Sequence, residues 1–302
     1  MASLVTENIE NTNTIQFNTN TFYENYDGYD DDKLKKVIMS ISYKGTEIKS
    51  DTEIKSNNIF YIVLDTSGSM QGNPIIYCKN TIEFIINNLK KKDKICIITF
   101  NSDVDELISL TNINEENKER LIKKVNNIEC SGCTNLSVGL FESIALIKEQ
   151  NTESNTIYNI ILLTDGIMNT GVKDDDQLIE ILTSKVNSLL IKPNIYTFGY
   201  SNNHKSSLLN DISSNNNGLY KYIEKEDDIP KFIGECIGGL NSCIALNISI
   251  TCKLNKQIEL IKFYNLDKKL IKTEEDKYKI NMGDCFSEEE KYIIMELNVS
   301  NI

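Results

Sequence analysis

The amino-acid sequence predicts an α/β protein: a doubly wound, mainly parallel six-stranded sheet with an additional small antiparallel β unit. Two continuous apolar runs, 59–64 and 160–163, have the composition of strands buried on both faces, as found at the centre of a parallel sheet. Between residues 58 and 240 predicted strands alternate with predicted helices, which is typical of βαβ units. Beyond residue 240 only strand patterns follow, and they indicate a separate antiparallel unit.

The chain divides into four parts in order. Residues 1–33 are polar and rich in Asn and Thr, so we expect a flexible tail. Residues 34–57 contain a partly alternating segment, 34–43, which predicts a strand of the β unit, and a linker. The α/β domain is expected at 58–240, and the β-rich C-terminal unit at 241–302.

The predicted α/β domain begins with a continuously apolar strand at 59–65. We expect this strand at the centre of the sheet, in the doubly wound order 3-2-1-4-5-6. Strand 106–110 follows strand 94–101 after a short loop, so the two should pair antiparallel at one edge, because a parallel return needs a long crossover. The other predicted strands are 157–164, 194–199 and 218–223. The predicted helices are 74–90, 114–126, 135–149, 175–190, 204–213 and 226–240.

The C-terminal part shows strand patterns without intervening helices. The segment 34–43 has no place among the six strands of the α/β domain, and it alternates as the C-terminal segments do. We therefore expect 34–43 to pair or pack with strands from the C-terminal part. The predicted C-terminal strands are 243–252, 258–264, 278–282 and 292–299.

Carboxylate and hydroxyl side chains gather where the buried strands end. Asp65, Ser67 and Ser69 follow the first buried strand. Asp165 follows the second, and Thr134 stands just before a predicted helix. Open α/β sheets bind ligands outside the carboxyl ends of their strands. These side chains are hard oxygen donors, which suit a hard cation such as Mg²⁺.

The pattern Asp-x-Ser-x-Ser at 65–69, the later threonine and the later Asp-Gly together resemble the metal-ion-dependent adhesion site of the von Willebrand factor type A (VWA) family. The resemblance covers roughly residues 58–240 and implies the Rossmann-like VWA fold. It implies that serines and a threonine bind the metal directly and that the aspartates often do so through water. It implies Mg²⁺ as the metal, with Mn²⁺ or Ca²⁺ as alternatives. The residues matched by the motif are Asp65, Ser67, Ser69, Thr134 and Asp165.

The resemblance also implies a metal-dependent protein–protein interaction module. Mg²⁺ keeps octahedral coordination and can leave one position open, which an Asp or Glu side chain of a partner protein would fill. Two alternatives stay open: a structural scaffold subunit with an incidental metal, and a Mg²⁺-dependent phosphotransferase or phosphatase. Haloacid-dehalogenase-like enzymes need a second acid where this chain has Ser67, so we expect no enzymatic activity.

Each site residue also has a purely structural interpretation. Asp65 and Ser67 suit hydrogen bonds to loop amides, and Thr134 suits the N-cap of helix 135–149. Asp165 with the glycine after it suits an ordinary turn. The joint arrangement favours the metal site, because in the VWA topology all five groups meet at one end of the sheet.

Two cysteines, Cys130 and Cys133, precede Thr134, where many VWA proteins have a glycine pair. An isolated Cys-x-x-Cys supplies only half of a tetrahedral zinc site, so we expect both thiols to be reduced and free of zinc. Their role is left open by the sequence. The acidic run 174–176 precedes a predicted helix and is expected to complement its dipole rather than to bind metal.

Composition excludes some partners. The formal net charge of the 302-residue chain is -12, which argues against nucleic acid and against docking on anionic lipid. No apolar run is long enough for membrane insertion, and no apolar leader follows Met1. We read the eight cysteines as reduced core thiols, and we expect an intracellular, cytoplasmic protein. The oligomeric state is not specified by the sequence.

Overall fold

The computed structural model describes residues 15–23, 35–46, 57–150, 156–200, 204–241, 243–255, 258–264, 270–274 and 277–299. The chain forms two compact units. Unit 1 comprises residues 1–54 and 239–302, and unit 2 comprises residues 55–238. Within the described residues, no helix is both long enough and apolar enough to cross a membrane.

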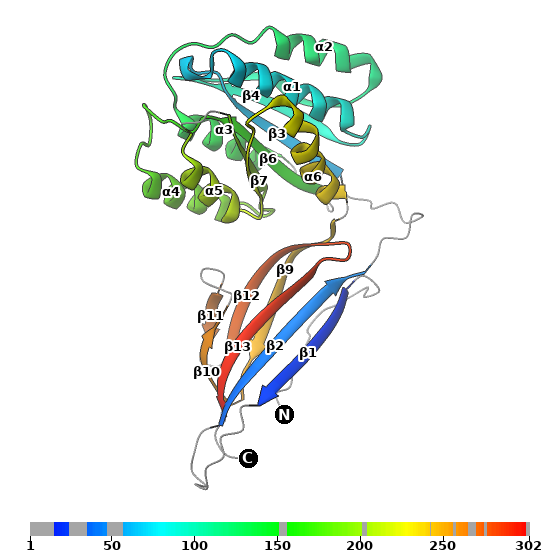
Figure 1. The fold of residues 1–302 in the computed structure, drawn as a ribbon, viewed down its shortest axis with the longest axis vertical. Helices are drawn as coiled ribbons and strands as arrows, with labels where there is room; N and C mark the ends of the chain where they lie inside the picture. The colour runs from blue at the N-terminus through cyan, green and yellow to red at the C-terminus, as the bar shows by residue number, and fades with distance from the viewer. Residues whose placement is uncertain are drawn as a thin grey trace. The chain divides into compact units, whose positions relative to one another are not determined.

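Unit 2 is built on a six-stranded sheet in the order β5-β4-β3-β6-β7-β8 (Figure 1). All neighbouring strands are parallel except β4 and β5, which pair antiparallel at one edge. The predicted fold class and the doubly wound strand order are therefore confirmed. The strands are β3 (Asn57–Asp65), β4 (Lys94–Phe100), β5 (Val104–Asn112), β6 (Thr156–Thr164), β7 (Asn194–Gly199) and β8 (Tyr220–Tyr222).

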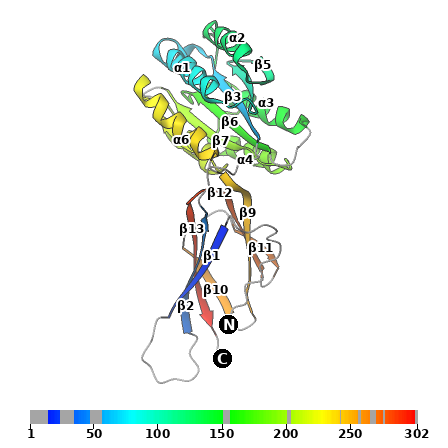
Figure 2. The same cartoon turned by 90° about the vertical axis from the view of Figure 1, so that its right-hand side faces the viewer.

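The central strands are apolar because both faces of the sheet are covered by helices (Figures 1 and 2). Every residue of β6 is buried, as is every residue of β3 after the first. One face packs on α3, α4 and α5, and α1 buries its apolar stripe on the other. The helices are α1 (Asn73–Asn88), α2 (Glu115–Asn126), α3 (Leu136–Glu149), α4 (Asp175–Asn187), α5 (Ser206–Ser214) and α6 (Ile229–Asn241).

Helix α3 lies unusually close to the sheet at Gly139. A Cβ atom at Gly139 would stand 2.6 Å from Cδ1 of Phe100 and 2.9 Å from Cγ1 of Val63. Real Cβ atoms essentially never approach other atoms so closely. The missing side chain of this glycine is therefore what lets α3 pack directly on β3 and β4.

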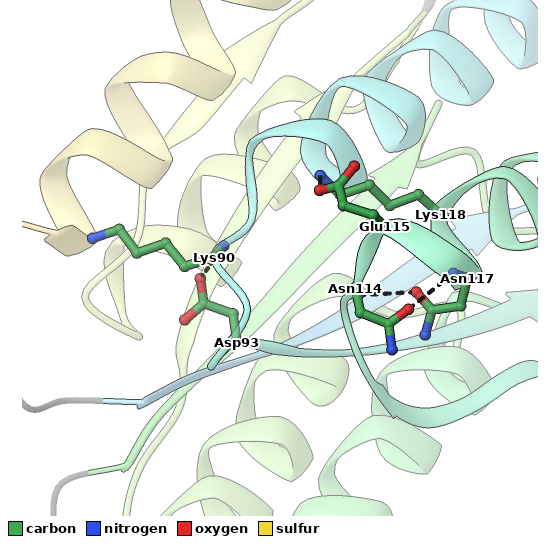
Figure 3. A network of polar contacts seen from close by, with 6 residues as sticks. All are labelled: Lys90, Asp93, Asn114, Glu115, Asn117 and Lys118. Carbon is green, nitrogen blue, oxygen red and sulfur yellow. Dashed lines mark hydrogen bonds and ion pairs between the residues drawn. The ribbon is translucent and has the colours of Figure 1, made fainter.

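The amino-terminal edge of the unit 2 sheet is fixed by side chains that bind backbone amides (Figure 3). The buried carboxylate of Asp93 accepts from the amide of Lys90 at 2.9 Å and from that of Asn58 at 3.3 Å. Asn114 and Asn117 form a reciprocal capping box at the start of α2, with distances of 2.9 and 3.0 Å. This edge lies at the opposite end of the strands from Asp65.

Unit 1 contains two antiparallel sheets that enclose one apolar core. The segment predicted at 34–43 forms β2, which pairs with β13, so Ile41 lies opposite Ile293. That predicted pairing is confirmed. The four-stranded sheet consists of β1 (Ile15–Tyr23), β2 (Lys35–Gly45), β13 (Glu290–Val299) and β10 (Ile258–Phe263). The three-stranded sheet consists of β11 (Leu270–Glu274), β12 (Lys277–Phe286) and β9 (Cys243–Lys253).

Two strands of unit 1 differ from expectation. Residues Ile15–Tyr23 were expected in a flexible tail but form β1, which pairs antiparallel with β2. Their sequence places Asn between Thr residues, so low hydrophobicity hid a strand that gains its stability from pairing with β2. The rest of the expected tail lies outside the described residues. Strand β11 was not predicted, because its five residues carry too little apolar alternation.

Candidate metal centre

The two candidate aspartates follow neighbouring strands at the carboxyl edge of the unit 2 sheet. Asp65 ends β3, and Asp165 comes directly after β6, which pairs in parallel with β3. Their exposed fractions are 0% and 1%. Among the ion pairs of the described residues, none includes either aspartate. The fold therefore buries two carboxylates at the ends of neighbouring strands, and neither has a basic partner among the described residues.

The Asp65 carboxylate is oriented by two hydrogen bonds. Its Oδ1 accepts from the amide of Ser67 at 2.9 Å, and its Oδ2 accepts from the hydroxyl of Thr164 at 2.6 Å. Burial raises the pKa of Asp65 to about 6; these hydrogen bonds lower it, and the charge of Asp165 raises it further.

The hydroxyls of the same loop lie close together. Oγ of Ser67 and Oγ of Ser69 are 3.1 Å apart. Adjacent oxygen ligands of an octahedral Mg²⁺ bound at 2.0–2.1 Å are separated by about 3 Å, so this spacing suits two ligands of one ion. Ser67 is buried and Ser69 is exposed, which leaves the hydroxyl pair at the boundary with solvent.

The loop that carries Thr134 is tied to the loop after β3. The amide of Gly68 donates to the carbonyl of Gly132 at 3.1 Å, and the amide of Ser131 donates to the carbonyl of Thr66 at 2.8 Å. Thr134 itself is buried. These two backbone hydrogen bonds fix the position of the Thr134 loop relative to the loop that carries Ser67 and Ser69.

A third loop, which follows β6, binds Thr134 from the other side. The Thr134 amide donates to Oδ1 of Asn169 at 2.7 Å. The Thr134 carbonyl accepts from the amides of Asn169 and Thr170, both at 3.2 Å. The Thr134 loop is therefore hydrogen-bonded both to the loop that carries Ser67 and Ser69 and to the loop after β6 that begins at Asp165. Metal binding by these residues remains a prediction.

The N-cap of α3 corrects one structural interpretation. Asn135, not Thr134, caps the helix, since its side-chain oxygen accepts from the amide of Val138 at 3.3 Å. The Thr134 side chain is thus not used for capping. By contrast, Asp174 does cap α4, accepting from the amide of Gln177 at 2.8 Å, in keeping with the structural interpretation of the acidic run.

The donor set fits a hard divalent cation. It combines two buried carboxylates that lack a basic partner with the hydroxyls of Ser67, Ser69 and Thr134. Such oxygen donors suit Mg²⁺, Mn²⁺ or Ca²⁺ better than a soft metal. Within the part of the chain described here, no group of three or more His, Cys, Asp or Glu could hold a metal. Cys130 and Cys133 are both free thiols.

Sequence reasoning missed two residues that shape this centre. The hydroxyl of Thr164 on β6 donates to Asp65 on the neighbouring strand β3, and the side chain of Asn169 joins the third loop to Thr134. The position of Thr164 at the end of a buried strand, next to Asp165, was a usable signal. Asn169 stands in a loop without periodicity, so no sequence signal could have identified it.

Mg²⁺ affinity should fall as the pH is lowered from 7 to 5. The native pKa of Asp65, about 6, lies above its ordinary value of 3.8. Without metal, the proton on this carboxyl favours the folded state at low pH, and that contribution is lost as the pH rises from about 4 to 6. A cation that binds at Asp65 must displace the same proton, so its affinity falls at a pH where this carboxyl is protonated. Calorimetric titrations at pH 5, 6, 7 and 8 test this, and an affinity that stays constant down to pH 5 contradicts it.

A sequence model of the von Willebrand factor type A domain matches residues 60–235. Inter-alpha-trypsin inhibitor heavy chain H3 of Mus musculus is 28% identical over 184 residues, which cover 58% of this chain and 20% of that relative. A von Willebrand factor A domain-containing protein of Dictyostelium discoideum is 26% identical over 187 residues, 61% of this chain and 19% of its own length. The chain thus spans about a fifth of the length of these curated relatives.

Solved structures share the fold. A von Willebrand factor type A protein from Catenulispora acidiphila aligns with 96% of this chain and 67% of its own, with a TM-score of 0.74 and 13% identity. A mutant of the PilB minor pilin from Streptococcus sanguinis aligns with 78% of this chain and 80% of its own, with a TM-score of 0.52 and 13% identity. At such low identity, these likenesses concern the fold alone.

The expected intracellular, cytoplasmic location is wrong in the light of these comparisons. The relatives include inter-alpha-trypsin inhibitor heavy chains, and the fold is shared with a minor pilin. The presence of this domain therefore does not indicate a cytoplasmic location. The expectation depended partly on reading the cysteines as reduced core thiols. Free thiols at buried positions are compatible with many surroundings, so they do not identify a compartment.

Proposed function

Because the chain belongs to the von Willebrand factor type A family, we propose that unit 2 is a metal-dependent protein-interaction module. Domains of this family commonly serve in protein interaction or adhesion, and the relatives are generally interaction modules rather than enzymes. In our proposal, Ser67, Ser69 and Thr134 bind Mg²⁺, and Asp65 and Asp165 balance its charge. An Asp or Glu side chain of a partner protein completes the coordination.

The observation that carries this proposal is the pair of buried aspartates on hydrogen-bonded loops. Two buried carboxylates that have no basic partner among the described residues must take up protons or be compensated by a cation, and near pH 7, above the pKa of Asp65, the cation is the favoured partner. The two loops that supply the hydroxyls are joined to each other by backbone bonds of 2.8 and 3.1 Å, so the loops are held together before any ion arrives. Two buried carboxylates beside a pair of hydroxyls 3.1 Å apart support cation binding better than they support a purely structural role.

The position of the centre supports recognition of an acidic partner. Gly68 and Ser69 are exposed, so the ion would be reached from solvent on that side. Two aspartates offset the double charge of Mg²⁺, and a third carboxylate, from the partner, would be accommodated by the strong preference of this ion for oxygen ligands. Because the chain itself carries a net charge of -12, the bound ion would supply local attraction that the chain otherwise lacks.

Capture of partner proteins should require the metal. The full chain is immobilised and exposed to lysate in Mg²⁺, in EDTA, and in EDTA followed by excess Mg²⁺, and bound proteins are identified by mass spectrometry. We expect a set of proteins that EDTA releases, that Mg²⁺ restores, and that excess of a short aspartate-containing peptide displaces. Repeating the experiment with Mn²⁺ and Ca²⁺ identifies which ion serves best.

The same experiment separates the interaction module from its alternative. If identical proteins bind in Mg²⁺ and in EDTA, the metal has no role in recognition and the domain acts as a scaffold. If EDTA releases the bound proteins but the aspartate-containing peptide does not, the metal shapes the surface without contacting an acidic side chain.

A further inference from the structure

We infer that Thr164 is a positioning residue of the metal centre, because its hydroxyl joins the Asp65 carboxylate to the turn that presents Asp165. This inference rests on the proposed metal-binding function. Thr164 is the last residue of β6 and is fully buried. It directly precedes Asp165 in the sequence and is hydrogen-bonded to Asp65, which is 99 positions away.

When Asp65 is ionised, the hydrogen bonds of the Thr164 hydroxyl have a single possible direction. The hydroxyl lies 2.6 Å from Oδ2 of Asp65 and 2.8 Å from the amide nitrogen of Gly166. An amide can only donate, so the oxygen of Thr164 accepts from Gly166, and its one hydrogen points to Asp65. A hydroxyl that donates to an ionised carboxylate at this distance forms a strong, charge-assisted bond.

The turn after Thr164 places Asp165. Gly166 has a φ of +71°, a conformation that glycine adopts readily, and its amide is the one held by Thr164. The next amide, of Ile167, donates to Oδ1 of Asp165 at 3.1 Å. The Asp165 carbonyl accepts from the amide of Lys205 at 3.3 Å. The Thr164 hydroxyl therefore holds two groups at the same time. One is the Gly166 amide in the turn, and the other is the Asp65 carboxylate on the neighbouring strand.

These bonds assign Thr164 a role different from that of a metal ligand. Its hydrogen and one lone pair are already used, and it lies within the strand rather than in the loops. Removing the hydroxyl would leave Oδ2 of Asp65 without its donor and the Gly166 amide without an acceptor, so that only the Ser67 amide would still hold the Asp65 carboxylate. Asp65 and the turn that carries Asp165 would each be held less firmly, which is the effect expected when a residue supporting metal ligands is removed.

Three variants of the full chain test this inference. Thr164→Val keeps the shape and removes the hydroxyl, whereas Thr164→Ser keeps the hydroxyl. Thr197→Val is the matched control: Thr197 is also fully buried, on β7, and its hydroxyl donates to the carbonyl of Leu209 at 2.8 Å. Mg²⁺ binding is measured by calorimetry, Mn²⁺ binding by electron paramagnetic resonance, and the metal-free melting temperature by circular dichroism.

We expect Thr164→Val to lower the affinity for both ions by about tenfold or more. Thr164→Ser should bind within about threefold of the natural chain, and Thr197→Val should do so even where its melting temperature falls. If Thr164→Val does not fold, Thr164→Ala makes the same comparison. Unchanged affinity in the Val or Ala variant overturns the role of Thr164 alone. If the natural chain binds neither ion, the proposed function itself is overturned, together with this inference.

Discussion

Asp65→Ala should abolish Mg²⁺ binding by the full chain while leaving unit 2 folded. The substitution removes one of the two buried negative charges and the carboxylate that Ser67 and Thr164 orient. Its effect on stability contains two opposing parts. The Thr164 hydroxyl loses its acceptor, which costs about 1–3 kcal/mol, but a carboxylate whose burial raises its pKa to about 6 is no longer buried. The free energy of unfolding should therefore change little compared with the complete loss of metal binding.

Calorimetry and melting of the metal-free protein measure the two effects separately. Asp93→Ala is the matched control, because Asp93 is also a buried aspartate that accepts backbone amides, at the opposite edge of the same sheet (Figure 3). It should lower the melting temperature and keep the Mg²⁺ affinity. If Asp65→Ala binds Mg²⁺ as the natural chain does, these loops do not form the metal centre.

Gly139→Ala should destabilise unit 2 by about 1–3 kcal/mol, the cost of forcing an extra methyl group into a packed core. The new Cβ would meet the ring of Phe100 at 2.6 Å and the Val63 side chain at 2.9 Å, so α3 would have to move away from the sheet. Thr134 lies two residues before α3. The displacement should therefore weaken Mg²⁺ binding as well as stability.

Urea unfolding followed by circular dichroism at 222 nm tests the effect of Gly139→Ala, since the described helices belong almost wholly to unit 2. Gly234→Ala is the matched control. Gly234 lies within α6, and a Cβ there would have no neighbour within 4 Å. That control should stabilise the unit by about 0.5–1 kcal/mol, because alanine favours a helix more than glycine does. Equal midpoints for Gly139→Ala and the natural chain would contradict close packing of α3.

The sheet of unit 2 could be predicted because each of its central strands carries its own signal. A strand covered on both faces needs an unbroken apolar run, as in 59–64, and the short loop after β4 dictates an antiparallel edge. The five candidate ligands could be named because the Asp-x-Ser-x-Ser pattern, the later threonine and the later Asp-Gly resemble the adhesion-site motif of the VWA family. The parallel pairing of β3 with β6 then places Asp65 and Asp165 at the same edge of the sheet.

What the sequence concealed depends on contacts between distant residues. The bond between Thr164 and Asp65 exists only because β3 and β6 become neighbours. The choice of Asn135 over Thr134 as the cap of α3 was equally hidden, since both residue types favour that position and the backbone decides between them. Strand β1 was missed for a related reason: its pairing with β2 supplies what its polar composition does not.

The pairing of β2 with β13 also determines when unit 1 can finish folding during synthesis. Its partner β13 follows unit 2 in the sequence, and the hydroxyl of Ser287 donates to the carbonyl of Thr46 across 241 positions. During synthesis β2 therefore leaves the ribosome before unit 2, and its pairing with β13 must wait until residues 290–299 have been translated. Residues 55–238 have all their strand partners within themselves, so they can fold while the final strands are still being made. The nascent chain thus carries a folded unit 2 while unit 1 is still incomplete, and the unpaired edge of β2 is open to incorrect pairing until β13 has been made.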